Sequence, residues 1–231
     1  MTSITVVYDN HASGELRAGW GFSAYVRTEG ATVLLDVGAD KLVFEHNARA
    51  LGVPLDSIVA LVVSHDHCDH MGAMSSAFHK GLAFYVPKAV SKRYERIGKG
   101  GIHFHAVKDP VDIVPGVRSI GQMGKQIPEQ ALLVDGASGP ALITGCAHMG
   151  IEHLVARATE LAGAPLDLVL GGFHLFNKRI EEVERTIGAL DTYQVNRIAP
   201  CHCTGDEAIA AFQDALGDRY VPVEVGTRIV V

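Results

Sequence analysis

The chain has 231 residues, a hydrophobic fraction of 48% and a formal net charge of −6, so it can bury a sizeable core in one large or two small domains. It carries no basic tract that would suit a nucleic-acid backbone, and no run approaches the roughly 18 apolar residues that cross a bilayer. We therefore expect a cytoplasmic protein with neither a nucleic-acid nor a membrane partner.

The first part of the chain predicts strands and one helix. Residues 42–51 have the apolar spacing of a helix, which Gly52 and Pro54 end. The polar, glycine-containing loop at residues 9–21 could border a pocket. Strands are expected at residues 4–8, 22–26, 32–35 and 58–63. The last of these is a run of apolar, largely β-branched residues, which is typical of a strand buried on both faces.

A dense polar segment follows that buried strand, at residues 64–70, with the sequence Ser-His-Asp-His-Cys-Asp-His. Sites in α/β sheets form where strands end, so this segment is a candidate site rather than a solvated loop. Its three imidazoles and a carboxylate are nitrogen and oxygen donors that suit a borderline divalent metal. The spacing suggests two sites, with His65 and His67 for one ion and Asp69 and His70 for a second.

The middle of the chain predicts short elements separated by turns. One helix is expected at residues 71–79 and another from Pro87 to about residue 97. His103 and His105 share one face of a strand. They either enter a substrate pocket or, as we favour, stay exposed with Phe104 turned inward. Further strands are expected at residues 82–86, 111–113, 117–120 and 131–134.

The second half of the chain alternates strands with helices. Strands are expected at residues 141–144, 166–170, 197–200, 221–225 and 227–231, with helices beginning at Ile151, Ile180 and Asp206. Polar residues follow three of these strands, at Cys146, His174 and His202. No linker-like shift divides the chain, so we expect one domain over residues 1–231. The order of elements favours two β-sheets sandwiched by helices, although periodicity alone also allows a doubly wound sheet.

The polar segment resembles the HxHxDH signature of the metallo-β-lactamase superfamily, with Ala73 in place of a following glycine. Residues 144–148, 171–175 and 200–203 resemble the subgroup of small metal-dependent hydrolases that includes dihydropterin-ribofuranosyl-aminobenzene-phosphate synthase-like proteins. The resemblance implies a four-layer αβ/βα sandwich, in which two mixed β-sheets are flanked by helices. It also implies that Asp36, in a segment similar to the family's LLDxG turn, supports the metal loop from behind.

The resemblance further implies two divalent metal ions, for which we expect zinc, with iron or manganese as alternatives. His65 and His67 would bind the first ion, and Asp69 and His70 the second. His202 matches the family's last ligand histidine.

The chain departs from the family pattern at the sixth ligand. Relatives carry a histidine in an HTPG motif, but residues 120–123 contain none. His148 is our candidate for the missing ligand. Cys146 stands where relatives have a bridging aspartate, and it is either a ligand or a small buried thiol.

His174 resembles a histidine that some phosphodiesterases of the superfamily use to protonate a leaving group or to hold substrate; the alternative is an extra metal ligand. Cys68, Cys201 and Cys203 flank candidate ligands, and we expect reduced thiols that serve in packing. On a strand-like backbone, Cys201 and Cys203 should point away from His202.

These expectations combine into a hydrolase that uses a metal-bridged hydroxide on a small-molecule ester, a phosphoester in particular. Asp69 and His174 are its candidate catalytic residues. The alternatives are a pterin-linked transferase or synthase of the same family and a non-catalytic metal-binding or sensing protein. The substrate and the oligomeric state are not indicated.

Overall fold

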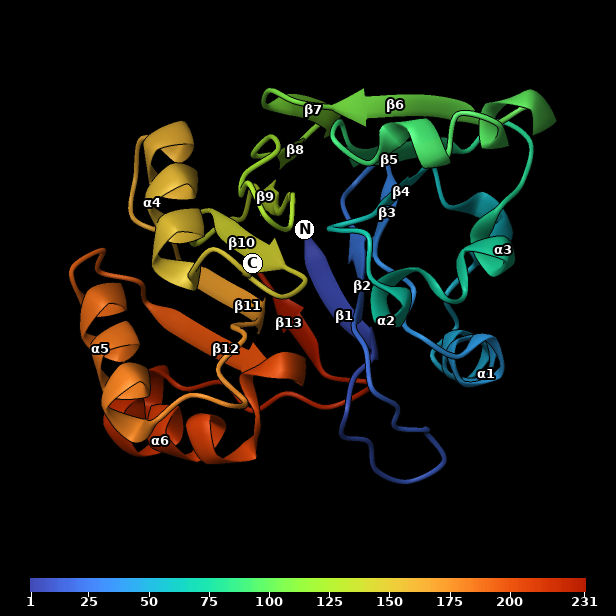
Figure 1. Ribbon diagram of the computed structural model, residues 1–231. Helices are drawn as coiled ribbons and strands as arrows, with labels where there is room; N and C mark the ends of the chain where they lie inside the picture. The colour runs from blue at the N-terminus through green and yellow to red at the C-terminus, as the bar shows by residue number, and fades with distance from the viewer.

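Two β-sheets stand face to face, and helices cover their outer faces (Figure 1). The computed structural model describes residues 1–231, apart from the side chain of Lys99. The first sheet has the order β13-β1-β2-β3-β4-β5-β6 and the second the order β12-β11-β10-β9-β8-β7. Both sheets contain parallel and antiparallel pairs, for example β3 with β4 and β1 with β2. The expected αβ/βα sandwich is therefore confirmed.

The strand bounds agree with most of the expected ranges. The first sheet contains β1 (Ser3–Tyr8), β2 (Ser23–Arg27), β3 (Thr32–Leu35), β4 (Ala60–Val62), β5 (Ala83–Pro87), β6 (His103–Val107) and β13 (Arg228–Val230). The second contains β7 (Val111–Val114), β8 (Val117–Ser119), β9 (Leu132–Val134), β10 (Ala141–Thr144), β11 (Leu168–Gly172) and β12 (Arg197–Cys201).

Successive side chains of each strand point to opposite faces of its sheet, and together they build three apolar layers. In β4, Ala60 and Val62 face the layer between the two sheets, whereas Leu61 faces the outer layer of the first sheet. In β10, Ile143 lies between the sheets and Leu142 lies under the helices of the second sheet. Because these central strands are covered on both faces, their sequences are continuously apolar.

Helices α1 (Lys41–Ala50), α2 (Cys68–Met71) and α3 (Met74–Ala77) lie outside the first sheet, and α4 (Ile151–Ala162), α5 (Ile180–Asp191) and α6 (Asp206–Leu216) lie outside the second (Figure 1). The spacing of Ile151, Leu154 and Val155 predicts the buried face of α4 correctly, since all three side chains are fully covered. No helix among the described residues is long and apolar enough to cross a membrane.

Three sequence predictions of local structure are wrong. Pro87 ends β5 instead of beginning a helix, and only the short 3₁₀ turns Ser91–Arg93 and Ile97–Gly100 follow it, in a segment rich in glycine. Residues 71–79 form no single helix, because α2 and α3 are separate turns with Gly72 between them. Residues 221–225 form no strand: the N–H of Val221 donates to the Ile198 carbonyl of β12 at 2.9 Å, but Pro222 has no N–H with which to continue a ladder, and a turn begins at Val225.

The pair His103 and His105 lies on β6, at the edge of the first sheet, and both side chains are exposed. The ring of His105 stacks on Tyr85 at 4.4 Å, while Phe104 packs against the outer apolar layer. This agrees with the expectation of an exposed strand face.

Candidate metal centre

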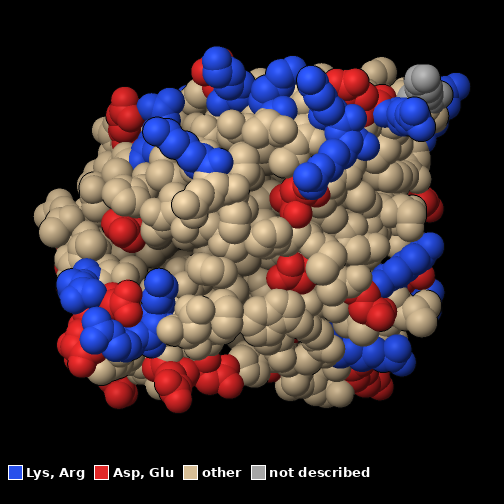
Figure 2. Space-filling view, viewed as in Figure 1, with Lys and Arg blue, Asp and Glu red and all other residues tan. Residues whose placement is uncertain are grey.

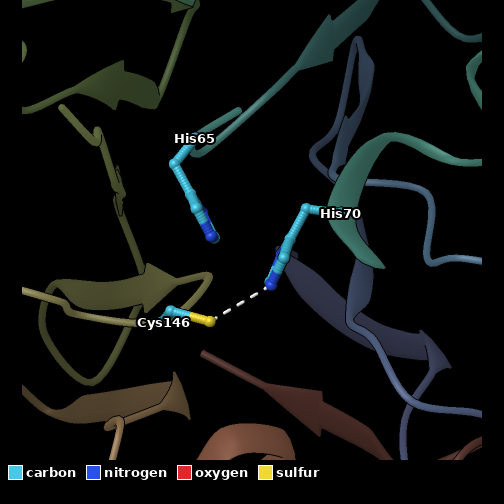
Figure 3. Close-up of side chains that lie close together, drawn as sticks. All are labelled: His65, His70 and Cys146. Atoms are coloured by element: carbon cyan, nitrogen blue, oxygen red, sulfur yellow. Dashed lines mark hydrogen bonds between the residues drawn. The ribbon is translucent and has the colours of Figure 1, made fainter. Parts of the chain in front are cut away.

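The polar segments that follow β4, β10, β11 and β12 all meet at one end of the two sheets. His65 follows β4, Cys146 follows β10, and His202 begins the turn after β12. In Figure 3 the side chains of His65, His70 and Cys146 point toward a common centre, and the His70 Nε2 to Cys146 Sγ distance is 3.2 Å. Parallel strands that end at one edge bring these residues together although they are far apart in the sequence.

The donors form two triads. His65, His67 and His148 make the first triad, and Asp69, His70 and His202 make the second; within each triad the possible ligand atoms lie within 4.8 Å of one another. Cys146 forms a further group with His65 of the first triad and His70 of the second, whose possible ligand atoms also lie within 4.8 Å of one another, so its sulfur lies between the triads. The structure thus brings together all seven residues that the sequence nominates as ligands, and their binding of metal stays a prediction.

Asp36 supports both triads from behind, as the family resemblance implies. It is fully buried at the end of β3, with a positive φ of 57°. Its Oδ1 accepts the backbone N–H of Ser64 at 2.7 Å, and its Oδ2 accepts the Ser64 hydroxyl at 2.6 Å and His70 Nδ1–H at 2.7 Å. The carboxylate therefore holds the start of the metal loop and one of its histidines at once.

This arrangement determines which ring nitrogen of each histidine carries the proton. Asp36 can only accept, so His70 donates from Nδ1 and turns Nε2 toward the centre. The Ser64 hydroxyl donates its only hydrogen to Asp36. In the 2.9 Å contact between Ser64 and His65, His65 Nδ1–H must therefore donate to Ser64 Oγ. In their neutral forms, both histidines consequently present a lone pair on Nε2, the nitrogen that would bind a metal.

His202 is oriented by the loop between β1 and β2. Its Nδ1 lies 3.1 Å from Asn10 Oδ1, Asn10 Nδ2 donates to the His202 carbonyl at 2.9 Å, and Asp9 Oδ1 accepts the His202 backbone N–H at 3.0 Å. Burial raises the pKa of Asp9, against the hydrogen bonds from the backbone of His11 and His202 that lower it. Sequence reasoning did not find Asp9 or Asn10, since they lie about 190 residues from His202.

Burial favours the neutral form of three of the clustered histidines. Burial, together with repulsion from His174 and His67, lowers the pKa of His148 to about 3. Burial also lowers the pKa of His65 and His67, with neighbouring imidazoles adding to the effect at His65. Burial acts in the same direction on His70, but the Asp36 carboxylate outweighs it and raises the pKa. Neutral imidazoles are the form that binds metals.

The second triad's carboxylate is kept ionised. Burial opposes ionisation of Asp69, but its hydrogen bond with His202 and the charges on His70 and His202 outweigh burial and lower its pKa. An ionised Asp69 is the form that can ligate a cation.

The donors fit divalent cations. Two nitrogens of the first triad, His65 Nε2 and His148 Nε2, are buried and have no hydrogen-bond partner among the described residues. In the second triad, His70 Nε2 and His202 Nε2 are 3.2 Å apart, close to the roughly 3.3 Å that separates two nitrogens bound to one tetrahedral zinc. Buried lone pairs that face one another are costly unless a cation lies between them.

Cys203 corrects one expectation. We expected it to point away from its neighbour His202, as it would on a strand, but residues 202–204 form a 3₁₀ turn and His202 has a positive φ of 48°. The Cys203 sulfur therefore lies within 4.8 Å of donor atoms of Cys146 and His202. Cys201 does pack in the layer between the sheets, and Cys68 is exposed.

His174 lies beside the first triad. Its ring centroid is 4.3 Å from that of His148, and its Nδ1 is buried without a hydrogen-bond partner among the described residues. It also forms a possible ligand group with Cys146 and His148. Both roles considered for His174, proton donor and extra ligand, are compatible with this position.

Glu129 supports the loop of His148, a role with no local signal in the sequence. The side chain is fully buried, and Oε1 accepts the backbone N–H of Met149 at 3.1 Å. Burial raises the pKa of this carboxyl to about 7, against the hydrogen bonds that lower it.

Comparison with known proteins identifies the fold. The chain is 24% identical over 231 residues to the 7,8-dihydropterin-6-methyl-4-(β-D-ribofuranosyl)-aminobenzene-5'-phosphate synthase of Methanocaldococcus jannaschii, with 79% of each chain covered. A solved metal-dependent hydrolase of the β-lactamase superfamily superposes with a TM-score of 0.84 at 24% identity, covering 100% of this chain and 99% of that chain. The protein has the metallo-β-lactamase fold.

A further structure with the metallo-β-lactamase fold is Zn²⁺-bound PqqB from Methylobacterium extorquens, with a TM-score of 0.65, 12% identity and coverage of 99% of this chain and 100% of that chain. No family model matches the chain. The expected resemblance is thus confirmed, and the fold neighbours include metal-dependent and zinc-bound proteins.

The structure explains how this metallo-β-lactamase fold accommodates Ala73 in its signature. A Cβ atom on Gly72 would lie 1.8 Å from the carbonyl oxygen of Ala39, so that position requires glycine. Ala73, by contrast, has a negative φ of −98° and packs its methyl group into the outer apolar layer. The second position therefore tolerates a side chain.

Proposed function

We propose that the protein is a metal-dependent hydrolase that cleaves a small-molecule ester, in particular a phosphoester. The observation that carries the proposal is the pair of facing donor triads with the Cys146 sulfur between them. Two divalent cations held there, zinc in the first instance, would supply Lewis-acid stabilisation and a water of lowered pKa. His65, His67 and His148 would hold one cation, and Asp69, His70 and His202 the other.

The chain's own residues prepare this chemistry. Asp36 and Ser64 keep His65 and His70 in the tautomer that presents Nε2. His174 belongs to neither triad, and its Nδ1 has no hydrogen-bond partner among the described residues, which supports the proposal that this imidazole would deliver a proton to a leaving group. The two preceding glycines allow the backbone to approach closely, since a Cβ on Gly172 would lie 2.5 Å from the Gly145 carbonyl oxygen.

A cavity beside His174 has room for a small-molecule substrate. Its volume is about 490 Å³, within the range of about 300–1,000 Å³ that is usual for small-molecule sites. His148 and His174 line it, and its charged lining consists of Lys178 and Arg185 together with Glu152 and Glu182. Lys178 is paired with Glu182 at 3.9 Å. Arg185 forms no ion pair among the described residues, and a phosphate group would gain from it.

Group transfer is the second candidate, because the Methanocaldococcus jannaschii relative is a synthase. The same cations and the same proton donor would serve transfer if an acceptor other than water occupied the cavity. Analysis of the products formed from a phosphoester, with and without an added acceptor, distinguishes hydrolysis from group transfer. A protein that binds metal but turns over no ester would favour a sensing role.

The first test counts metals. Zinc-loaded wild-type protein should hold two equivalents by native mass spectrometry. His67→Ala should lose about one, and Asp69→Ala should empty or weaken the other site. His153→Ala is the matched control, since this exposed histidine lies on α4 and its Nε2 lies 3.8 Å from Glu152 Oε1. A wild-type protein that binds one metal contradicts the two-site assignment.

The second test concerns His174. His174→Ala should keep both metals and the fold, while turnover falls by about 10²–10⁴ if the imidazole is a general acid. The loss should be smaller for an ester with a good leaving group, which needs no proton. Loss of a metal equivalent would make His174 a ligand, and an equal loss on both esters would make it a binding residue.

A further inference from the structure

Two exposed aromatic side chains flank the candidate metal centre. Trp20 is 51% exposed and Phe176 is 50% exposed. Their ring centroids are 5.8 Å apart and their planes meet at 79°, so the two rings form a corner, which we call the aromatic corner. The Trp20 ring lies 5.1 Å from His202, and the Phe176 ring lies 5.5 Å from His174. The corner is therefore continuous with both sides of the centre.

Trp20 is held in place although half of it faces solvent. It lies between two closely packed glycines: a Cβ on Gly19 would meet the Tyr8 hydroxyl at 2.3 Å, and one on Gly21 would meet the Asp69 carbonyl oxygen at 2.3 Å. The N–H of Gly21 also donates to Asn10 Oδ1 at 3.3 Å. The loop that carries Trp20 is thus anchored to the loop of the second triad.

Phe176 is anchored to the turn after β12. Its N–H donates to the Cys203 carbonyl at 3.2 Å, and a Cβ on Gly205 would lie 2.6 Å from the Phe176 Cα atom. Two large, half-exposed apolar rings are unfavourable for the protein alone, and their anchored backbones lower the entropic cost of binding a ligand between them.

The cavity at the corner suits an uncharged planar group. It has a volume of about 550 Å³, and Trp20, Leu175 and Phe176 supply its apolar wall. The charged residues in its lining are one lysine, Lys178, and two acidic residues, Asp206 and Glu207, so the cavity does not favour an anion. Figure 2 shows one face of the molecule, on which Lys and Arg gather along the upper rim, at the lower left and at the right, and Asp and Glu side chains also lie near the middle.

We propose that the aromatic corner binds a planar aromatic group of the substrate, stacked on one ring with its edge against the other. The inference rests on the proposed function for the position of the ester, which would lie at the triads while the ring occupies the corner. Offset-stacked and edge-to-face contacts of this kind favour an aromatic ring over a saturated one of similar size by about three- to tenfold.

The first experiment follows Trp20 directly. The chain contains a single tryptophan, so one indole N–H signal in a ¹⁵N-correlated NMR spectrum of the full-length, zinc-supplied protein reports on the corner. Quinazoline-2,4-dione, a neutral planar bicycle, should shift this signal saturably, and its octahydro analogue should not at the same concentration. Phe176→Leu should weaken the effect of the planar probe about three- to tenfold. An indole signal that does not respond overturns the proposal, whatever the metals do.

The second experiment links ring and ester. Phenylphosphonate should bind about three- to tenfold more tightly than cyclohexylphosphonate by calorimetry. Trp20→Phe and the remote exposed control Leu42→Ala should keep that preference, whereas Trp20→Ala and Phe176→Leu should abolish it.

The outcomes separate the two proposals. Equal binding of both phosphonates to the wild-type protein, or a preference that survives Trp20→Ala, refutes the corner and leaves the hydrolase proposal intact. A responsive indole signal without binding of either phosphonate supports the corner and counts against the phosphoester.

Discussion

Replacing Asp36 by asparagine should disable both triads through the proton positions of their histidines. The substitution keeps the shape of the side chain and lets Oδ1 still accept from the Ser64 backbone N–H. The other side chain atom, however, changes from an acceptor into an NH₂ donor, at 2.6 Å from Ser64 Oγ and 2.7 Å from His70 Nδ1. His70 must then accept at Nδ1, so its proton moves to Nε2, the atom that faces the centre.

The same reversal reaches the first triad. If Ser64 Oγ accepts from the introduced amide, its own hydrogen turns toward His65 Nδ1, and the proton of His65 also moves to Nε2. Loss of such supporting partners costs about 10- to 100-fold in metal affinity. At about 1.4 kcal/mol for each tenfold change, this corresponds to about 1.4–2.8 kcal/mol of binding free energy. The loss of charged hydrogen bonds should also lower the free energy of unfolding of the metal-free protein by about 1.5–3 kcal/mol.

Chelator-competition titrations with zinc measure the effect on affinity. The matched control is Asp167→Asn, which removes a similarly buried carboxylate that is paired with Arg197 and is not part of either triad. It should lower stability but leave zinc affinity within about twofold of the wild type. Asp36→Asn with wild-type affinity, or an equal loss of affinity in both variants, would refute the argument from tautomers.

Three other predictions follow from individual positions. His148→Ala should remove about one zinc equivalent by native mass spectrometry, and retention of both would exclude His148 as a ligand. In the metal-free protein, Glu129 is protonated in the folded state up to its raised pKa of about 7, whereas in the unfolded chain it ionises near 4.5; folding therefore weakens as pH rises through this window. In urea unfolding, the free energy of unfolding of Glu129→Gln relative to that of the wild type should increase by up to about 3 kcal/mol between about pH 5 and 8. A difference between the two proteins that does not change with pH would contradict this. Gly72→Ala should lower the free energy of unfolding by more than about 3 kcal/mol because of the 1.8 Å clash with Ala39, while Gly188→Ala, with open space around its Cβ, should raise it by up to about 1 kcal/mol.

Local sequence patterns determined the layers of this protein and much of its centre. Runs such as Ala60–Val62 and Ala141–Thr144 are continuously apolar because they are covered on both faces, and residues 64–70 concentrate metal donors directly after one of them. Those properties depend on neighbours in the chain, so the sequence displays them. Periodicity also predicted α4 and its buried face, since a helix repeats its pattern within a few residues.

Tertiary structure alone decided which distant residues support and extend the centre. Asn10 orients His202, Glu129 holds the loop of His148, and Trp20 meets Phe176, in each case across sequence separations that no local pattern spans. The turn of Cys203 toward the donors likewise depends on the positive φ of His202, which the packing of the chain imposes against the residue's own preference. Hydrogen bonds and packing act through space, and a strand or helix pattern records only which face of an element is covered, not what covers it.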